Sequence, residues 1–307
     1  MAGQAATGKA FEYSILEQVV NIFNEKSINI EIIENTSYTI AKGFFDDFTE
    51  VEQNKYTLAS IAGLHYIFES ENQIFTYNDV KICIQDDSQG ILGDVRDVVL
   101  KSETAGYEIG FSAKNNHKAL KHSRLSKRLD FGDKWLNHPC SIEYFDEICP
   151  IFNMLTAKKR DGIAWSDIDA KGANVYVPIL EAFKRELQRL IDTYDDVPEL
   201  FIRYIIGKQD FFKIIKQNRS QSTQLMVFNF DNTIINFEQT LLPTEITSIE
   251  FKENSDTTII VTLNNDWKIS FRIHSASTLV EASLKFDVTL ISEPTNIYLD
   301  NVNWINE

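Results

Sequence analysis

The stretch GDVRDVVLKSETAGYEIGFSAK, residues 93–114, decides the fold that this sequence predicts. Its VVL triplet at 98–100 is apolar and rich in β-branched residues, and YEIGFSA at 107–113 alternates apolar or aromatic with small or polar residues, which is typical of strands. The intervening ETAG supplies turn-forming residues. The stretch therefore predicts a β-hairpin whose second strand ends at Lys114.

The length of the turn sets the register of this hairpin. If ETAG is the turn, Ser102 pairs with Tyr107, and Asp97 lies opposite Ser112. Cross-strand neighbours are ~5 Å apart. Lys114 shares the face of Ser112 because the side-chain period of a strand is two. Asp97 and Lys114 can therefore converge on one phosphate.

This pair of residue types suits metal-dependent phosphodiester cleavage. A carboxylate holds a hard divalent cation through oxygen, and a nearby cation stabilises the charge that develops on the phosphate. Such residues are also common on surfaces at strand ends, but here Asp94 and Asp97 flank Arg96 inside an apolar stretch. Glu108 is on the same face, but four residues along the strand is roughly 13 Å, too far for the same metal on a regular hairpin.

A concentrated basic segment follows the hairpin. Residues 114–128 carry six cations (Lys114, Lys118, Lys121, Arg124, Lys127 and Arg128) and no acid, although the chain has a net charge of −15. Residues 231–307, in contrast, hold 12 acids against 4 bases. An acidic body with one basic segment indicates a focused polyanion site. The apolar residues among the cations favour a helix over 115–129.

Hydrophobic periodicity divides the rest of the chain into a helical part and a β-rich part. Spacing close to 3.6 predicts helices over 8–24, most of 55–80, 142–155, 178–194 and 201–215. A period of two predicts strands at 223–230, 244–251, 257–263, 267–273 and 285–291. We therefore expect an α+β core followed by a β-rich C-terminal third.

Composition excludes several classes of protein. No apolar run approaches the ~18 residues of a membrane span, and the first residues lack the apolar core of a secretory signal. Three cysteines, Cys83, Cys140 and Cys149, form neither a closed disulfide framework nor a CxxC zinc pattern. His117 and His122 are five residues apart, which does not place them on one helical face. A cytoplasmic protein with free thiols is expected.

Five segments together resemble the HaeIII family of type II restriction endonucleases. They are GKAFEY, GDVRDVVL, EIGFSAKNNHKALKHSRLS, DFGDKW and RYIIGKQDFFKII, and they span residues 7–220 in that order. The resemblance implies the PD-(D/E)xK nuclease fold, a mixed α+β or α/β structure in which helices flank a sheet with a central catalytic hairpin. It also implies Mg²⁺-dependent cleavage of both strands of duplex DNA, with Mn²⁺ as a substitute. Residues 1–220 would form the catalytic and DNA-binding core, and 221–307 a β-rich subdomain packed on it.

The same resemblance assigns roles to individual residues. It makes Asp97 the metal-binding aspartate and Lys114 the catalytic lysine. Ser112 stands where the family's fold usually has a second carboxylate, which leaves Asp94, Glu108 and Glu12 as candidates for the missing ligand. The DNA-contacting residues would be Asn115, Asn116, His117, Lys118, Lys121, His122, Ser123, Arg124 and Lys127.

Three functions compete on these observations. The first is a type II restriction endonuclease that reads a short duplex site, GGCC-like if it follows the family's namesake, as a homodimer matched to a palindromic target in the prokaryotic cytoplasm. The second is a sequence-specific DNA-binding protein whose nuclease core lost a ligand at Ser112. The third is an RNA-processing or repair nuclease on the same fold. Digestion of DNA with and without magnesium separates the first two.

Overall fold

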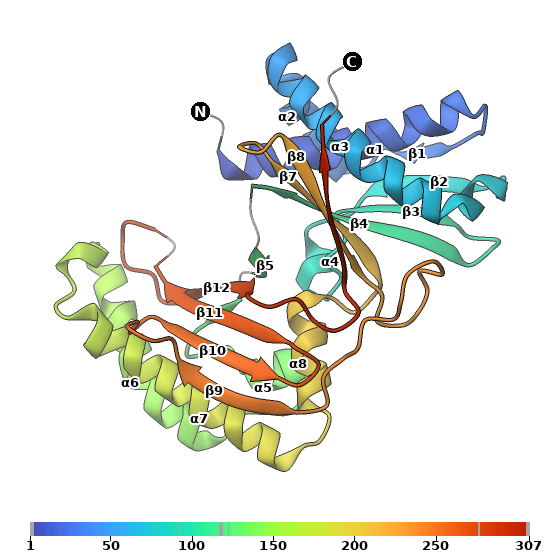
Figure 1. Ribbon diagram of the computed structural model, residues 1–307. Helices are drawn as coiled ribbons and strands as arrows, with labels where there is room; N and C mark the ends of the chain where they lie inside the picture. Colours follow the sequence, from blue (N-terminus) through green and yellow to red (C-terminus); the bar gives the residue numbers. More distant parts are fainter. Residues whose placement is uncertain (1–2, 92, 117–118, 122, 276, 305–307) are drawn as a thin grey trace. The chain divides into compact units, whose positions relative to one another are not determined.

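The computed structural model describes residues 3–91, 93–116, 119–121, 123–275 and 277–304. The chain divides into two compact units, and each unit is built from separate segments of the sequence (Figure 1). The first unit comprises residues 1–118, 207–240 and 296–307. The second comprises residues 119–206 and 241–295.

A mixed sheet forms the centre of the first unit. Among the described residues it has seven strands, in the order β1-β2-β3-β4-β7-β8-β13. Their bounds are β1 Glu31–Ile33, β2 Val80–Ile84, β3 Val98–Ser102, β4 Tyr107–Asn115, β7 Phe211–Gln217, β8 Ser222–Phe228 and β13 Tyr298–Asn303. The β1–β2 and β4–β7 pairs are parallel and the remaining pairs are antiparallel.

Helices cover one face of this sheet. They are α1 Gln4–Glu25, α2 Thr36–Asp46 and α3 Glu50–Ser70; the unit also contains the short η1 Asn72–Thr76 and α4 Ser88–Ile91. The stripe predicted for the first helix is confirmed, because Phe11, Ile15 and Val19 are fully buried in one core with sheet residues such as Phe111 and Phe212. A capping box between Thr49 and Glu52 fixes the start of α3. The fold class predicted from the sequence, a mixed sheet flanked by helices, is confirmed.

The second unit has its own sheet and helices. The strands β5 Ala119–Lys121, β9 Ile246–Phe251, β10 Thr258–Leu263, β11 Lys268–His274 and β12 Leu284–Leu290 pair in the order β5-β12-β11-β10-β9, and β6 Arg124–Leu125 also pairs with β12. The helical elements are α5 Phe131–Leu136, α6 Ile142–Arg160, η2 Trp165–Asp167, η3 Gly172–Tyr176, α7 Val177–Thr193 and α8 Val197–Ile206. The helices predicted over 142–155 and 178–194 are therefore confirmed, as are the strands that became β9 to β12.

The helix expected over residues 115–129 is wrong. Its described residues end β4 and then form β5 and β6, both paired with the edge of β12. Lys121 lies opposite Val288, and Leu125 lies opposite Leu284 and is fully buried. An available strand edge therefore overrides the weak local preference for a helix.

The helix expected over 201–215 is only half correct. It ends as α8 at Ile206, and Gly207 then adopts φ +139°, a backbone conformation open mainly to glycine. Residues 211–217 form β7, which lies between β4 and β8. Six of its seven residues are buried, so the strand shows no alternation, and hydrophobic periodicity cannot distinguish it from a buried helix.

The division expected at residue 220 falls inside the β7–β8 hairpin and does not separate the two units. β8 and β13 complete the first sheet, whereas β9 to β12 belong to the second unit. Sequence order predicts the strands but not their exchange between two sheets.

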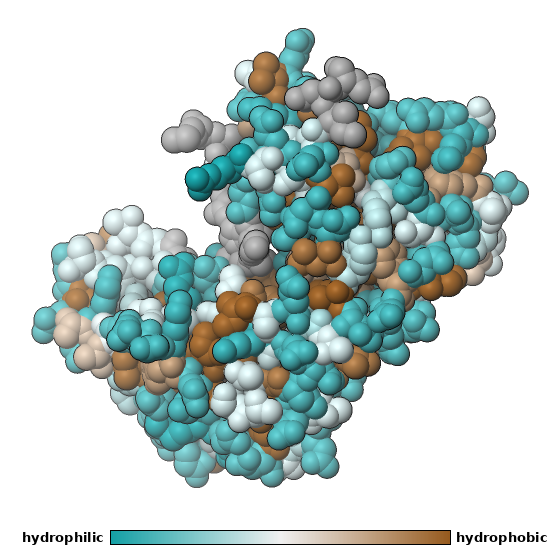
Figure 2. Space-filling view, viewed as in Figure 1, coloured by the Kyte–Doolittle hydropathy of each residue, from teal (hydrophilic) through white to brown (hydrophobic). Residues whose placement is uncertain are grey.

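Hydrophilic residues dominate the surface seen in Figure 2. Apolar side chains that remain exposed, such as Val51 and Ile142, are scattered over different elements, which is ordinary for a globular chain. Within the described part of the chain, no helix is both long and apolar enough to span a bilayer.

Candidate active site

The hairpin of β3 and β4 has the predicted register. Residues 103–106 form the turn, in which the Gly106 N–H donates to the Glu103 carbonyl at 3.3 Å. Ser102 faces Tyr107, and the ladder continues to Val98 opposite Phe111. Asp97, the next residue, donates its backbone N–H to the Phe111 carbonyl at 2.7 Å. The predicted register is confirmed from Val98 to Ser102; Asp97, just before it, bonds to Phe111 rather than pairing with Ser112, although its side chain reaches the Ser112 hydroxyl.

Asp97 lies just before the first residue of β3, and its carboxylate binds the end of β4. Its Oδ2 accepts the Ala113 backbone N–H at 2.7 Å, the Lys114 Nζ at 3.0 Å and the Ser112 hydroxyl at 3.2 Å. The side chains of Asp97 and Lys114 are 23% and 26% exposed, so both can meet a ligand. Oδ1 accepts no hydrogen bond from the described residues, which leaves one carboxylate oxygen open toward a cation. The predicted convergence of Asp97 and Lys114 is confirmed.

Glu12, on α1, is electrostatically coupled to this pair. Burial and the neighbouring charge of Asp97 raise the pKa of Glu12 to about 8, although the positive charges of Lys9 and Lys114 act in the opposite direction. Lys9 Nζ donates to Glu12 Oε2 at 3.0 Å and to Asp87 Oδ1 at 2.6 Å. Glu12 is therefore a buried carboxyl group close to the charge of Asp97. We call Asp97, Lys114 and Glu12 the Asp97 site.

Lys9 is a residue that the sequence analysis did not single out. The signal for it is its i,i+3 spacing to Glu12 on an amphipathic helix, which places a cation beside a buried carboxyl group. The ion pairs with Glu12 and Asp87 raise the pKa of Lys9 despite its partial burial, so the amine stays charged.

Asp94 and Glu108 lie in a different cluster, organised by Arg96. The Arg96 guanidinium donates to Asp94 Oδ1 and Oδ2, both at 2.8 Å, and to Glu108 Oε1 at 2.5 Å. Gln85 adds a hydrogen bond of 3.0 Å to Asp94 Oδ2. Arg96 lies so close over Gly110 that a Cβ there would be 2.0 Å from its Cδ, which explains the glycine. We call these side chains the Arg96 cluster.

Asp94 and Glu108 share the single positive charge of Arg96. Burial raises the pKa of Asp94, but hydrogen bonds from Arg96 and Gln85 outweigh it and leave that pKa lowered. Asp94 and Glu108 are thus already paired with a cation. For Glu12, in contrast, the charge of Asp97 is one of the causes that raise the pKa.

The donor set of the Asp97 site fits a hard divalent cation. Mg²⁺ keeps several waters and usually takes one or two protein carboxylates. Asp97 with its open Oδ1 and Glu12 can supply that number. In the part of the chain described by the structure, no group of three or more His, Cys, Asp or Glu side chains could hold a metal ion. A metal held by these two carboxylates would complete its coordination with water and substrate oxygen.

The residues expected to contact DNA are only partly placed. Asn115 ends β4 and Asn116 follows it, with its amide Nδ2 3.3 Å from Asn115 Oδ1. His117, Lys118 and His122 lie outside the described residues.

The other four of these residues have partners inside the second unit. Lys121 Nζ donates to the Tyr204 carbonyl at 2.8 Å and lies 3.7 Å from the centre of the Tyr204 ring. Ser123 is buried against the Tyr204 hydroxyl. Arg124 is 3.0 Å from the Ser283 hydroxyl, and Lys127 is 2.8 Å from Asn153 Oδ1. The structure thus gives each of these four side chains a partner within the protein.

Comparison with known proteins extends over nearly the whole chain. The family model described as HaeIII restriction endonuclease matches residues 8–294. The type II restriction enzyme HaeIII of Haemophilus aegyptius is 38% identical over 309 residues, which cover 97% of this chain and 97% of that enzyme.

Proposed function

Because this chain belongs to the HaeIII restriction endonuclease family and is a site-specific deoxyribonuclease that uses a divalent metal, we propose that it cleaves duplex DNA at the Asp97 site. The observation that carries this proposal is the contact of Lys114 with Asp97 at 3.0 Å on neighbouring strands, with both side chains partly exposed. Neither the position of the site nor the roles of its residues follows from family membership alone.

We assign the metal to Asp97 and Glu12, and we propose that the metal is Mg²⁺. Bound there, it would polarise a phosphate oxygen and lower the pKa of a coordinated water. Asp97 contributes its open Oδ1, while Ala113, Ser112 and Lys114 hold Oδ2 in place. Glu12 must lose its proton to bind, and a nearby cation favours that loss.

Lys114 stabilises the negative charge that develops on the phosphate during cleavage. Its ammonium is anchored by Asp97 and can turn toward a phosphate oxygen as negative charge develops there. A positioned donor of this kind typically contributes a factor of about 10² to 10³ to the rate. Ser112 accordingly serves to position Asp97 rather than to bind metal, which explains how the chain tolerates a hydroxyl in place of a carboxylate.

Duplex DNA is the substrate, and its backbone meets the chain at the end of β4. We propose that Asn115 and Asn116, with cations of the basic segment 114–128, supply phosphate contacts. Such contacts fix position and affinity rather than sequence. A palindromic target suits a homodimer, whose two-fold axis matches that of the site. We place the reaction in the prokaryotic cytoplasm, where it would meet duplex DNA.

A digest of plasmid DNA of known sequence tests the function. We expect discrete fragments with Mg²⁺ or Mn²⁺, none with EDTA, and cut positions that share one short sequence; a duplex with a GGCC site is the first to try. Lys114→Ala should bind this DNA yet cut it about 10²- to 10³-fold more slowly. Specific binding by the wild-type protein without cleavage would instead support a DNA-binding protein that has lost catalysis. A preference for structured RNA or damaged DNA would support an RNA-processing or repair nuclease.

A further inference from the structure

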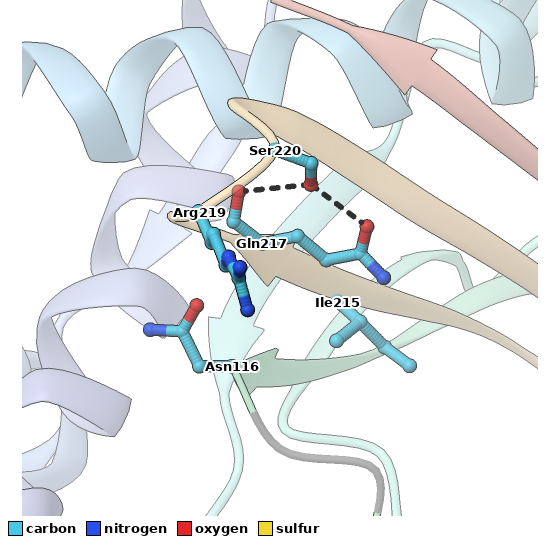
Figure 3. Close-up of a pocket in the computed structure, with 5 residues that line it drawn as sticks. All are labelled: Asn116, Ile215, Gln217, Arg219 and Ser220. Atoms are coloured by element: carbon cyan, nitrogen blue, oxygen red, sulfur yellow. Dashed lines mark hydrogen bonds between the residues drawn. The ribbon is translucent and has the colours of Figure 1, made fainter.

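The hairpin of β7 and β8 lies beside the strand that carries Lys114. β4 and β7 are parallel, and Lys114 pairs with Ile215. Side chains of paired residues lie on the same face of the sheet, so Lys114 and Ile215 share a face. Gln217, two residues further along β7, lies on that face as well. A pocket of about 440 Å³ opens here, lined by Asn116, Ile215, Gln217, Arg219 and Ser220 (Figure 3). The pocket therefore continues the line of the Asp97 site along β4.

Hydrogen bonds fix the turn of this hairpin, residues 218–221. The Asn218 backbone N–H donates to Asn116 Oδ1 at 2.7 Å, and the Asn116 N–H donates to the Lys216 carbonyl at 2.7 Å. The Lys216 ammonium binds the Asn218 side chain. These bonds tie the turn to the end of β4.

The side chain of Gln217 is also fixed, by hydroxyls of the turn and of β8. Its Oε1 accepts the hydroxyls of Ser220 at 3.2 Å and Ser222 at 3.0 Å. This orientation leaves the amide Nε2 of Gln217 without a hydrogen bond to a described residue, so it is a free donor on the pocket wall (Figure 3).

Arg219, at the tip, contrasts with this fixed frame. It is exposed and, among the described residues, has neither a carboxylate nor any other hydrogen-bond partner. Arg96, the other arginine of the first unit, binds two carboxylates. In Figure 3 the Arg219 guanidinium points into the space lined by Asn116 and Gln217. In a chain of net charge −15, an unpaired guanidinium on a rigid turn is available for an external acceptor.

We propose that Arg219 reads a base edge of the DNA target beside the scissile phosphate, with Gln217 as a second donor; this inference rests on the proposed function. The pocket begins at Asn116, two residues beyond Lys114, which is about 7 Å along the strand. That distance equals about two base-pair steps of duplex DNA, so a base near the scissile phosphate is within reach. A two-stranded ribbon fits the major groove, and bidentate arginine to guanine is the commonest specific contact there. The rigid turn favours a base contact because base readout depends on fixed geometry.

The test compares Arg219→Gln and Arg219→Lys with the wild-type protein. The control is Arg160→Gln, at an arginine that is 80% exposed in the second unit. The cut site is first mapped with the wild-type protein. Cleavage in Mg²⁺ is then measured as kcat/KM on that duplex and on duplexes with each base pair of the site replaced singly. Binding is measured without metal as a function of salt.

For Arg219→Gln we expect a loss of roughly 5- to 150-fold on the mapped site. We also expect discrimination to disappear at one base pair while the others stay selective. Arg219→Lys should keep the salt dependence but lose the same discrimination, because it keeps the charge without the bidentate fork. The control should match the wild type.

Two outcomes would overturn the inference. An equal loss on every duplex, with a salt slope lower by about one and rescue by Arg219→Lys, would make Arg219 a phosphate contact. Unchanged kinetics would place the hairpin away from DNA. Failure of the proposed function looks different, because the wild-type protein would then give no defined cuts.

Discussion

Two clusters of charge lie one residue apart on the same hairpin, yet they have opposite characters. In the Arg96 cluster, a single guanidinium binds Asp94 and Glu108 through short hydrogen bonds. In the Asp97 site, three donors bind Oδ2 of Asp97, and Oδ1 accepts no hydrogen bond from a described residue. The buried Glu12 has a raised pKa although Lys9 binds it.

The difference shows how the same residue types serve structure or chemistry. In the Arg96 cluster a cation contacts both acids directly, whereas at the Asp97 site burial and the charge of Asp97 raise the pKa of Glu12 and favour its protonated form. We propose that a divalent cation binds at the Asp97 site, where Asp97 Oδ1 is open, and not in the Arg96 cluster, where Arg96 already binds both carboxylates. Changes in the Asp97 site should therefore affect the reaction, and changes in the Arg96 cluster should affect stability.

The largest effect is expected for Asp97→Asn. The amide can still accept the Ala113 N–H, so the fold should persist, but the site loses its central charge for the metal. We expect cleavage to fall at least about a thousand-fold, or roughly 4 kcal/mol in the barrier. Single-turnover cleavage in Mg²⁺ measures this loss, and a gel shift checks that DNA binding is retained. Near wild-type cleavage by this variant would place the active site elsewhere.

Arg96→Met tests the other cluster. It leaves the largely buried Asp94 without its cation, and removal of one partner of such a pair costs about 3 kcal/mol of the free energy of unfolding. Denaturant titration measures this loss. Cleavage per folded molecule should stay within a few-fold of the wild type. The double variant Arg96→Met with Asp94→Asn should recover part of the stability, and a double variant no more stable than the single one would contradict the pairing.

Glu12→Gln and Glu108→Gln form a matched pair across the two clusters. Glu12→Gln should lower activity about 10- to 100-fold and raise the Mg²⁺ concentration needed, as loss of a supporting group around a metal does. Glu108→Gln should leave the Mg²⁺ requirement unchanged. Cleavage rates over a Mg²⁺ titration compare the two, and the reverse result would move the second ligand to Glu108.

Much of the Asp97 site was predictable because it depends on local geometry. The ETAG turn fixes the register of the two adjacent strands, and Asp97, the residue just before the first strand, then lies within reach of Lys114. The placement of Glu12 depends on how α1 packs on the sheet, which periodicity does not specify, so the sequence left three acids open. In the structure Arg96 binds the other two, and this is why we propose Glu12.

The fold was predictable where elements are local and failed where pairing is distant. Helices with an apolar stripe, such as α1 and α7, match their predicted ranges within a few residues. β5 and β6 form only because β12, more than 150 residues later, offers an edge. β7 is a strand because both its faces are covered, a property of the assembled sheet.

The smallest effect concerns Lys216, a buried cation that binds no carboxylate among the described residues and so extends the comparison. Its ammonium lies 4.3 Å from the centre of the Tyr56 ring and 5.7 Å from that of Trp304. Burial, with a smaller contribution from Lys55, lowers its pKa from 10.5 to about 8, while Glu52 acts in the opposite direction.

Between pH 8 and 10.5 the unfolded chain therefore binds the Lys216 proton more tightly than the folded chain does. Linkage then makes this residue's contribution to stability rise with pH across that window. Lys216→Met should remove that rise, so the free energy of unfolding of the variant relative to wild type should be most favourable at pH 7.5 and decline toward pH 9.5. Urea titrations at these two pH values measure the difference, and a difference independent of pH would mean that Lys216 titrates normally.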